Sequence, residues 1–295
     1  MYAIRAVGVT KAYDERPVLD GFSVEIPVGE TFCLLGPNGA GKTTMVEILE
    51  GYRTADGGTV EVLGVDPHRG DAHFRSRIGI VLQQTTSFEN FTVSETVEMF
   101  ADLFPDPLGV DEALDLVELG PQRSQLAVNL SGGQRRRLDV ACGLVGRPEL
   151  LFLDEPTTGL DPEARRGLWA VIRRLRRQGT TVLLTTHYLD EAEHLADRIG
   201  VLLNGRLETV AAPAELGSRH AATATVRFVP PDTGDFRAWD RDGTMVATTT
   251  PTPARLVSEL EAEHGELVGL TVTRPSLEDI YLQMVERSGH GEVQS

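Results

Sequence analysis

The stretch Gly36–Thr44 constrains this chain more than any other feature of its sequence. It reads GPNGAGKTT and matches the pattern GxxxxGK[ST], whose glycines let backbone N–H groups turn inward around phosphate oxygens. The apolar run 31–35 before it predicts a buried strand, and 43–49 after it predicts a helix whose N-terminal dipole favours an anion. A glycine-rich turn with a solvated lysine is the alternative. The strand–loop–helix context favours a phosphate site, in which Lys42 holds the β- and γ-phosphates and Thr43 binds Mg²⁺.

Two acids, Asp154 and Glu155, follow a second short apolar run at 150–153. Such a run predicts a strand buried on both faces. A carboxylate at the end of such a strand lies beside the phosphate loop in nucleotide-binding α/β folds, so Asp154 is predicted to hold Mg²⁺, directly or through water. Glu155 is predicted to orient and deprotonate an attacking water. Taken alone, the pair could equally be two solvated acids at a strand end.

A second predicted anion site lies between these two motifs. The run 130–134 reads LSGGQ and precedes a predicted helix. The hydroxyl of Ser131, the bare N–H groups of two glycines and a helix N-terminus together favour an anion. An ordinary helix with Ser131 as its N-cap is the alternative. Two further polar stretches, 158–161 and 185–187, follow the acids in order.

With these motifs in this order, residues 2–216 resemble an ATP-binding cassette (ABC) ATPase, the family for which LSGGQ is the signature. The resemblance implies an α/β fold: a P-loop NTPase core with an antiparallel β subdomain and a helical subdomain at about 88–145. It also implies ATP and Mg²⁺ as cofactors. In this family, ATP lies between the P-loop of one subunit and the signature of another. A second ATPase subunit is therefore expected, and a homodimer is preferred to a heterodimer because both half-sites look intact.

The resemblance assigns roles residue by residue. It gives Glu155, His187 and Gln83 to catalysis, and Thr43, Gln83 and Asp154 to Mg²⁺. The residues that it assigns to the nucleotide are Tyr13, Gly36, Pro37, Asn38, Gly39, Ala40, Gly41, Lys42, Thr43, Thr44, Ser131, Gly132, Gly133, Gln134 and Asp161.

Several of these residues also have a purely structural interpretation. Tyr13 matches the family's adenine-stacking aromatic, but it could be a half-buried tyrosine between strands. His187 matches the histidine that contacts the γ-phosphate, although a histidine after a strand is often structural. Gln83 matches a glutamine that contacts Mg²⁺ or water, and strand register favours it over Gln84. Asp161 is expected at the dimer interface and could also cap a helix that begins with a proline.

Chain organisation predicts a second domain after residue 217. Strands are expected in the first domain at 2–8, 22–26, 31–35 and 58–63, with a helix at 162–178. Residues 218–287 predict a small α+β accessory domain, with strands at 221–227, 245–249 and 267–273 and helices at 253–264 and 276–285. Residues 288–295 predict a frayed tail.

Charge and hydropathy limit the location and the partners of the chain. The net charge is −16, from 28 basic and 44 acidic residues, which disfavours nucleic acid as a partner. No apolar run approaches the roughly 18 residues of a membrane span, and the first residues do not resemble a secretory signal. The two cysteines, Cys33 and Cys142, predict reduced core residues of a cytosolic protein. We expect a cytoplasmic protein held at the inner face of the membrane through a permease.

The segment 274–281, RPSLEDIY, resembles the C-terminal region of one ABC branch, although a plain capped helix would also explain it. That branch contains ATPases of ABC-2 exporters, including daunorubicin-type resistance subunits. The resemblance implies the ATP-hydrolysing subunit of a membrane exporter of drugs, antibiotics or lipids, acting with a separate membrane-spanning permease. A soluble ABC ATPase outside transport, of the cluster-assembly type, or the ATPase of an importer are the alternatives.

Overall fold

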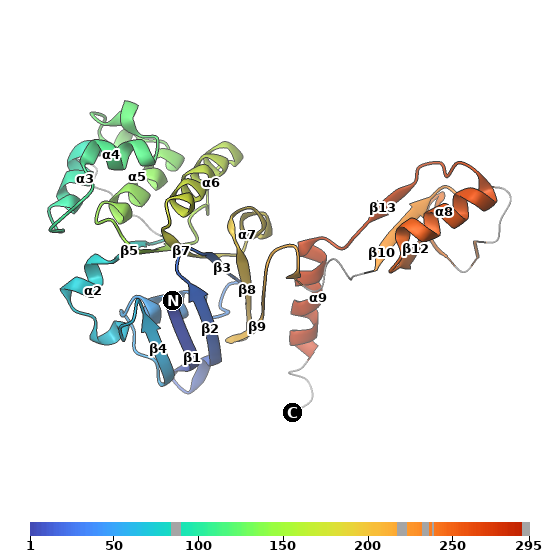
Figure 1. The fold of residues 1–295 in the computed structure, drawn as a ribbon, viewed down its shortest axis with the longest axis horizontal. Helices are drawn as coiled ribbons and strands as arrows, with labels where there is room; N and C mark the ends of the chain where they lie inside the picture. Colours follow the sequence, from blue (N-terminus) through green and yellow to red (C-terminus); the bar gives the residue numbers. More distant parts are fainter. Residues whose placement is uncertain (84–89, 217–222, 232–235, 238, 291–295) are drawn as a thin grey trace. The chain divides into compact units, whose positions relative to one another are not determined.

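The chain divides into two compact units, Met1–Pro213 and Ala214–Ser295, in the computed structural model (Figure 1). The structure describes residues 1–83, 90–216, 223–231, 236–237 and 239–290. The domain boundary expected near residue 217 falls outside the described residues.

The first unit is built on a six-stranded sheet with the order β5-β6-β7-β3-β8-β9. Its first five strands are parallel, and β9 pairs antiparallel at the edge. The strands are β5 (Ile78–Val81), β6 (Leu150–Asp154), β7 (Thr181–Thr186), β3 (Thr31–Leu35), β8 (Arg198–Leu203) and β9 (Arg206–Ala211). Every residue of β3, β6 and β7 is buried, as their continuous apolar runs predict for a parallel sheet covered on both faces.

A second, antiparallel sheet has the order β2-β1-β4, with strands β2 (Arg16–Pro27), β1 (Tyr2–Tyr13) and β4 (Gly57–Val62). The strands β1 and β2 extend well beyond the predicted 2–8 and 22–26. They pair as far as a tight turn at 14–15, where both residues have positive φ, as a two-residue hairpin requires. Phe22 of this sheet and Phe32 and Phe152 of the other belong to one buried cluster, which also includes residues of α1 (Lys42–Leu49). The two sheets and α1 therefore share a core.

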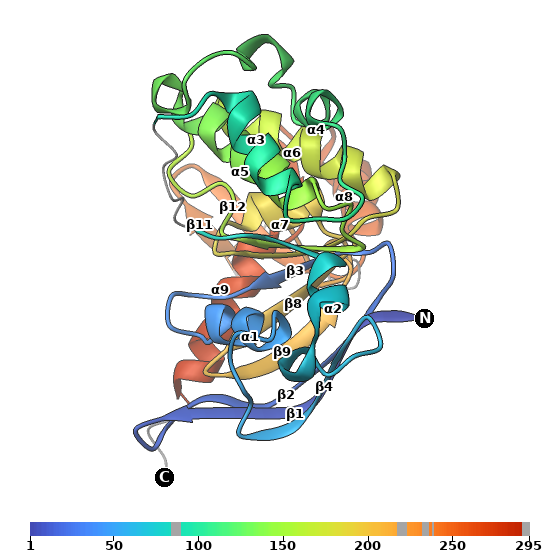
Figure 2. The ribbon, with the colours of Figure 1, turned by 90° about the vertical axis from the view of Figure 1, so that its left-hand side faces the viewer.

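The predicted helical subdomain is present and gathers at one end of this unit (Figure 2). It contains α3 (Val93–Ala101), α4 (Val110–Leu116) and α5 (Gly132–Leu144). A capping box between Thr92 and Glu95 starts α3. The remaining helices of the unit are α2 (Ala72–Ser76), α6 (Pro162–Arg177) and α7 (Leu189–Leu195). No described helix has the length and apolar character to cross a membrane.

The second unit is a small α+β arrangement. A four-stranded antiparallel sheet has the order β11-β12-β10-β13. Its elements are β10 (Ala224–Phe228), β11 (Asp240–Asp242), β12 (Met245–Thr250), α8 (Pro253–His264), β13 (Thr271–Thr273) and α9 (Leu277–His290). The core joins Val226, Phe228 and Val246 of the sheet to Leu260 of α8.

Two bounds in this unit differ from the sequence prediction by four residues or more. The last strand starts at Thr271 instead of 267, because Leu267 is buried in the core and Gly269 has φ +70°, which interrupts an extended chain. The last helix continues to His290, beyond the predicted end at 285. Strand β11 had no distinct sequence signal.

Arg136 of α5 ties the helical subdomain to the parallel sheet. Only 7% of this residue is exposed. Its guanidinium donates to the carbonyl oxygens of Leu82, Asp154 (3.0 Å) and Pro156 (2.9 Å), which lie at or just after the ends of β5 and β6. Burial lowers the pKa of Arg136, and nearby acids oppose that shift. One side chain thus fixes the helical subdomain to the strand ends that carry the two acids.

We predict that Arg136→Met lowers the free energy of unfolding by about 3 kcal/mol, because three carbonyl oxygens lose their donor. Urea denaturation followed by circular dichroism measures the change. The control is Arg173→Met on the exposed side of α6, for which we expect a change within about 0.5 kcal/mol. Equal effects of the two substitutions would contradict the role given to Arg136.

Candidate functional site

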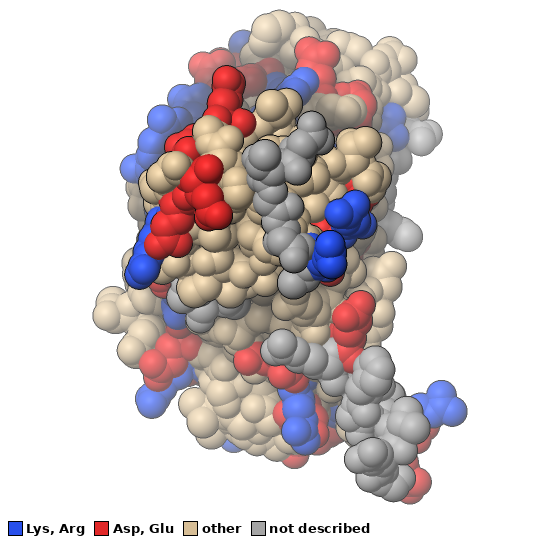
Figure 3. Space-filling model, turned by 90° about the vertical axis from the view of Figure 1, so that its right-hand side faces the viewer, with Lys and Arg blue, Asp and Glu red and all other residues tan. Residues whose placement is uncertain are grey.

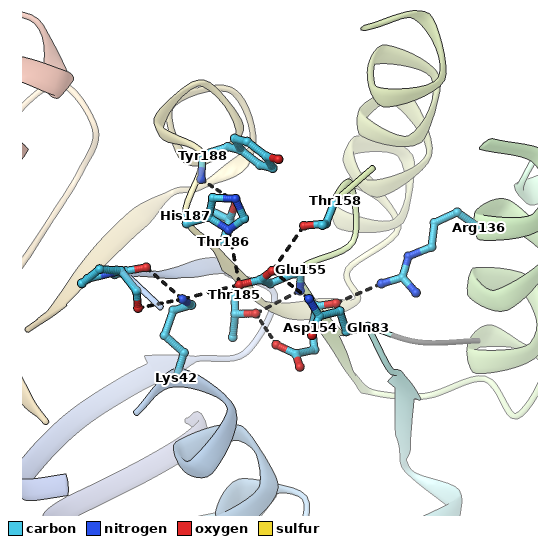
Figure 4. Close-up of polar contacts among 12 residues, drawn as sticks. Lys42, Gln83, Arg136, Asp154, Glu155, Thr158, Thr185, Thr186, His187 and Tyr188 are labelled. Atoms are coloured by element: carbon cyan, nitrogen blue, oxygen red, sulfur yellow. Dashed lines mark hydrogen bonds and ion pairs between the residues drawn. The ribbon is translucent and has the colours of Figure 1, made fainter. Parts of the chain in front are cut away.

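Parallel register brings three loops to one edge of the six-stranded sheet. Strand β7 lies between β3 and β6, with Leu35 paired to Thr186 and Asp154 paired to Thr185. The carboxyl ends of parallel strands meet at the same edge. The residues after β3, β6 and β7 therefore converge, and Figure 4 shows their side chains pointing toward one another.

The loop between β3 and α1 has the backbone of an anion site. Gly41 has φ +102°, and a Cβ there would lie 2.7 Å from the carbonyl oxygen of Val18, so only glycine fits. Gly39 also has positive φ, at +82°. Several amide N–H groups at this helix N-terminus have no acceptor among the described residues, namely those of Asn38, Gly39, Gly41, Lys42 and Thr43. Unpaired donors at a helix N-terminus fit a phosphate group.

Lys42 lies at the centre of the site with 5% of its surface exposed. Its ammonium donates to the carbonyl oxygens of Gly36, at 2.8 Å, and Pro37, at 3.2 Å. It also lies 3.5 Å from a carboxylate oxygen of Glu155. The cation thus joins the phosphate loop to the acid that follows β6.

Glu155 lies among side chains from four separate segments, and 11% of its side chain is exposed. Gln83 donates to one carboxylate oxygen at 3.1 Å, and Thr158 donates to the same oxygen at 3.3 Å. Nδ1 of His187 lies 3.3 Å from the other oxygen, the one nearest Lys42. The structure therefore places Gln83 and His187, two of the three residues assigned to catalysis, each in contact with the third, Glu155.

The backbone of Glu155 is also unusual. Its φ is +43°, a left-handed conformation that few residues other than glycine adopt. The N–H of Glu155 donates to the hydroxyl of Thr185 at 3.0 Å, which helps to hold this conformation. Strained backbone of this kind is typical of functional sites, because the surrounding contacts must maintain it.

Asp154 is buried beside Glu155, with 8% of its surface exposed. Burial raises the pKa of its carboxyl above the ordinary value, and a 2.5 Å hydrogen bond from the Thr185 hydroxyl partly opposes that shift. The negative charge of Glu155 raises this pKa further. A desolvated carboxylate gains from a cation, and Mg²⁺ prefers oxygen ligands, so Asp154 and the hydroxyl of Thr43 have the chemistry that a magnesium ion requires.

Thr185 is a residue that sequence reasoning left without a role. It is fully buried in β7, where its hydroxyl joins the side chain of Asp154 to the main chain of Glu155. The signal available in the sequence was a hydroxyl residue directly after the apolar run 182–184. The sequence could not show which neighbour it bonds, because that depends on the order of the strands.

Ser131 and Asp161 act as helix caps. Ser131 forms a capping box with Gln134 at the start of α5, with hydrogen bonds of 3.3 and 3.0 Å. Asp161 accepts from the N–H groups of Glu163 and Ala164, each at 2.9 Å, at the start of α6. Both residues line a separate hollow of about 280 Å³. Within the described part of the chain, neither contacts Lys42 or Glu155.

Tyr13 ends β1 with 37% of its surface exposed. The cationic groups of Lys11 and Arg53 lie 5.6 and 5.5 Å from its ring centroid. The predicted contact with adenine stays a prediction. Gln84, the alternative to Gln83, lies outside the described residues.

Comparison with known proteins finds similarity to ATP-binding proteins of one family. A family model described as ABC transporter matches residues 19–158. The chain is 36% identical to the daunorubicin/doxorubicin resistance ATP-binding protein DrrA of Streptomyces peucetius, over 98% of this chain and 93% of that protein. It is 37% identical to the Nod factor export ATP-binding protein I of Ralstonia nicotianae, over 95% of this chain and 92% of that protein.

Solved structures match the first part of the chain. The subunit cbiO1 of the cbiONQ ABC transporter complex from Clostridium perfringens is 28% identical with a TM-score of 0.66, covering 73% of this chain and 90% of that one. An ATP-binding cassette solved as a dimer in a post-hydrolysis state with ADP and Pi is 26% identical with a TM-score of 0.63, covering 71% of this chain and 98% of that one.

We predict that Lys42→Ala weakens binding of ATP at least about tenfold, because a buried cation facing the phosphate loop is lost. Isothermal titration calorimetry of the purified chain with ATP measures the affinity, and the exposed Arg173→Ala serves as a control for the removal of one positive charge. Unchanged affinity in Lys42→Ala, with a melting temperature equal to that of the wild type, would exclude the loop as the phosphate site.

Proposed function

The chain belongs to the ABC transporter family of ATP-binding proteins, and from this premise we propose that it hydrolyses ATP to energise a membrane exporter. The observation that carries the proposal is the grouping of Lys42, Glu155 and His187 at the mouth of the phosphate loop. The relatives named for daunorubicin/doxorubicin resistance and for Nod factor export align over 98% and 95% of the chain, so each alignment includes most of the second unit. The alternatives, an importer subunit or a soluble ATPase outside transport, have no such support.

Each residue of the site has a part in the proposed reaction. The free amides of the loop and Lys42 bind the phosphates, and Asp154 with Thr43 and Gln83 holds Mg²⁺, which neutralises phosphate charge when bound. Glu155 accepts a proton from the attacking water. Gln83 and Thr158 orient the carboxylate of Glu155, while His187 lies on its other oxygen. Lys42 must turn from Glu155 to the phosphate, which frees that carboxylate for water.

We predict that Glu155→Gln lowers the kcat of ATP hydrolysis at least about 100-fold, because the amide cannot take the proton. ATP-dependent dimerisation should persist, since phosphate binding by the loop is unaffected. A phosphate-release assay and size-exclusion chromatography with ATP measure the two properties. Glu61→Gln on the exposed surface of β4 is the matched control. Hydrolysis at the wild-type rate would show that another group is the base.

The proposed active form is a homodimer in head-to-tail arrangement. The signature residues 131–134 and the loop 36–44 supply two separate sets of helix N-terminal donors, and no hydrogen bond or ion pair joins them among the described residues. One ATP cannot use both within a chain built this way, whereas a second copy can supply the missing half. The dimeric post-hydrolysis relative is consistent with this proposal.

A membrane-spanning permease is the proposed second partner, and it holds the chain at the cytoplasmic face of the membrane. The first unit has a cavity of about 880 Å³ between the sheet core and the helical subdomain. We call this cavity the subdomain groove. Its walls come from the end of α1, from α2 and β5, and from α3 and α5, with Phe74, Ile80 and Phe100 among the apolar side chains. A short amphipathic segment of a permease fits a groove of this kind.

Charge argues against nucleic acid as a partner. The net charge of the chain is −16. On the face drawn in Figure 3, acidic side chains form a band and basic ones lie in smaller groups beside it and elsewhere, so the described residues drawn there form no broad basic patch. Binding to a polyanion requires such a patch.

We predict that tagged Glu155→Gln, captured with ATP from detergent-solubilised membranes of the native host, recovers a multi-span membrane protein identified by mass spectrometry. The substitution should prolong the ATP-bound dimer and so preserve the complex. An untagged preparation processed in parallel is the control for nonspecific recovery. Recovery of soluble proteins alone would favour the non-transport alternative.

A further inference from the structure

Glu50 is an acid without a partner inside the subdomain groove. It follows α1 directly as the C-terminal cap and lines the cavity. No described side chain donates to its carboxylate or forms an ion pair with it. Burial raises the pKa of this carboxyl to about 8, and the negative charges of Asp154 and Glu47 add to that effect.

The other charged groups of the groove are already engaged. Glu47 pairs with Arg53. Arg75 donates to the carbonyl oxygen of Gly70 at 2.9 Å, and Arg135 donates to that of Val128 at 3.2 Å. Asp139 lies 3.7 Å from Arg136. Both arginines of the groove wall thus have acceptors, and Glu47 and Asp139 each lie near an arginine. For Glu50, the described residues supply neither a side-chain donor nor a cation.

The place of Glu50 favours a cation from outside the chain. The C-terminal end of a helix carries a partial negative charge, which adds to the carboxylate and attracts a positive group. The aliphatic stem of a lysine or arginine can pack against apolar walls such as Phe74 and Ile80 while its charged end reaches the acid. A neutral segment would leave a desolvated carboxyl unpaired, and an acidic one would raise its pKa further, whereas a cation favours the charged form.

We propose that Glu50 selects the permease segment that occupies the subdomain groove, and that this segment carries a lysine or arginine whose side chain pairs with the Glu50 carboxylate. The inference rests on the proposed function and names the chemistry of that partner. It also gives the groove a direct connection to the ATP site, because α1 runs from Lys42 at the phosphate loop to Leu49, next to Glu50. A contact at Glu50 is therefore one short helix away from the nucleotide.

The test compares how much permease the full-length tagged chain recovers from native membranes. We expect Glu50→Gln to lower recovery about tenfold and Glu50→Lys to abolish it, because the pairing charge is removed or reversed. Glu61→Gln should recover as much as the wild type. Replacing the partner's lysine or arginine with Glu should restore recovery by Glu50→Lys, and each cytoplasmic lysine and arginine of the permease is tested in turn.

Each outcome decides a separate question. If the wild type recovers no membrane protein, the proposed function fails, and this inference fails with it. If Glu50→Gln recovers as much permease as the wild type, or no charge exchange restores Glu50→Lys, the groove binds a neutral or acidic segment and only this inference is overturned. If the Glu50 variants melt at a lower temperature than the wild type, their instability alone would lower recovery. The pairing is then tested on the partner: each lysine and arginine of the permease is replaced with Gln, and its recovery by the unaltered chain is measured. A loss at one position supports the pairing, and no loss at any position overturns it.

Discussion

The register of β7 between β3 and β6 is the constraint on which the site depends. It sets Thr186 level with Leu35 and Thr185 level with Asp154, so three loops from distant parts of the sequence end together. The hydroxyl of Thr185 then joins Asp154 to the main chain of Glu155. A shift of one residue in this pairing would turn that hydroxyl to the opposite face of the sheet. The geometry of both acids therefore depends on a strand that supplies no acid itself.

Buried polar contacts extend this arrangement to the helical subdomain. Arg136 donates to the main chain around the two acids and brings α5 with it. The start of α5 carries the signature residues, and among the described residues the capping box alone uses their N-terminal donors. Any movement of α5 relative to the sheet must therefore alter either the contacts of Arg136 or the position of the strand ends. This gives the proposed dimer a physical route from the signature to Glu155, the proposed base.

The ion pair between Lys42 and Glu155 shows how the site is arranged before phosphate enters. Both groups are largely buried, and each satisfies part of the other's charge at 3.5 Å. A buried ion loses much of its hydration, so a partner at this position lowers the cost of keeping the loop ready. A phosphate would take over the lysine and release the carboxylate, so binding and the freeing of the base would occur together. Helix α1 links the same lysine to Glu50, and through it to the subdomain groove.

The sequence by itself determined the local elements and the chemistry of the site. The glycines at 36–41 specify their loop because only residues without a Cβ fit its conformation, and the apolar runs at 31–35 and 150–153 specify buried strands. Tertiary structure alone decided that β7 separates β3 from β6, that Arg136 binds the strand ends, and that Glu50 faces a groove. These features depend on contacts between residues far apart in the chain, which local periodicity does not encode. The same reason explains the unpredicted edge strand β9, since an edge strand is defined by its neighbour and not by its own pattern, whereas the buried apolar run of β8 was a signal available in the sequence.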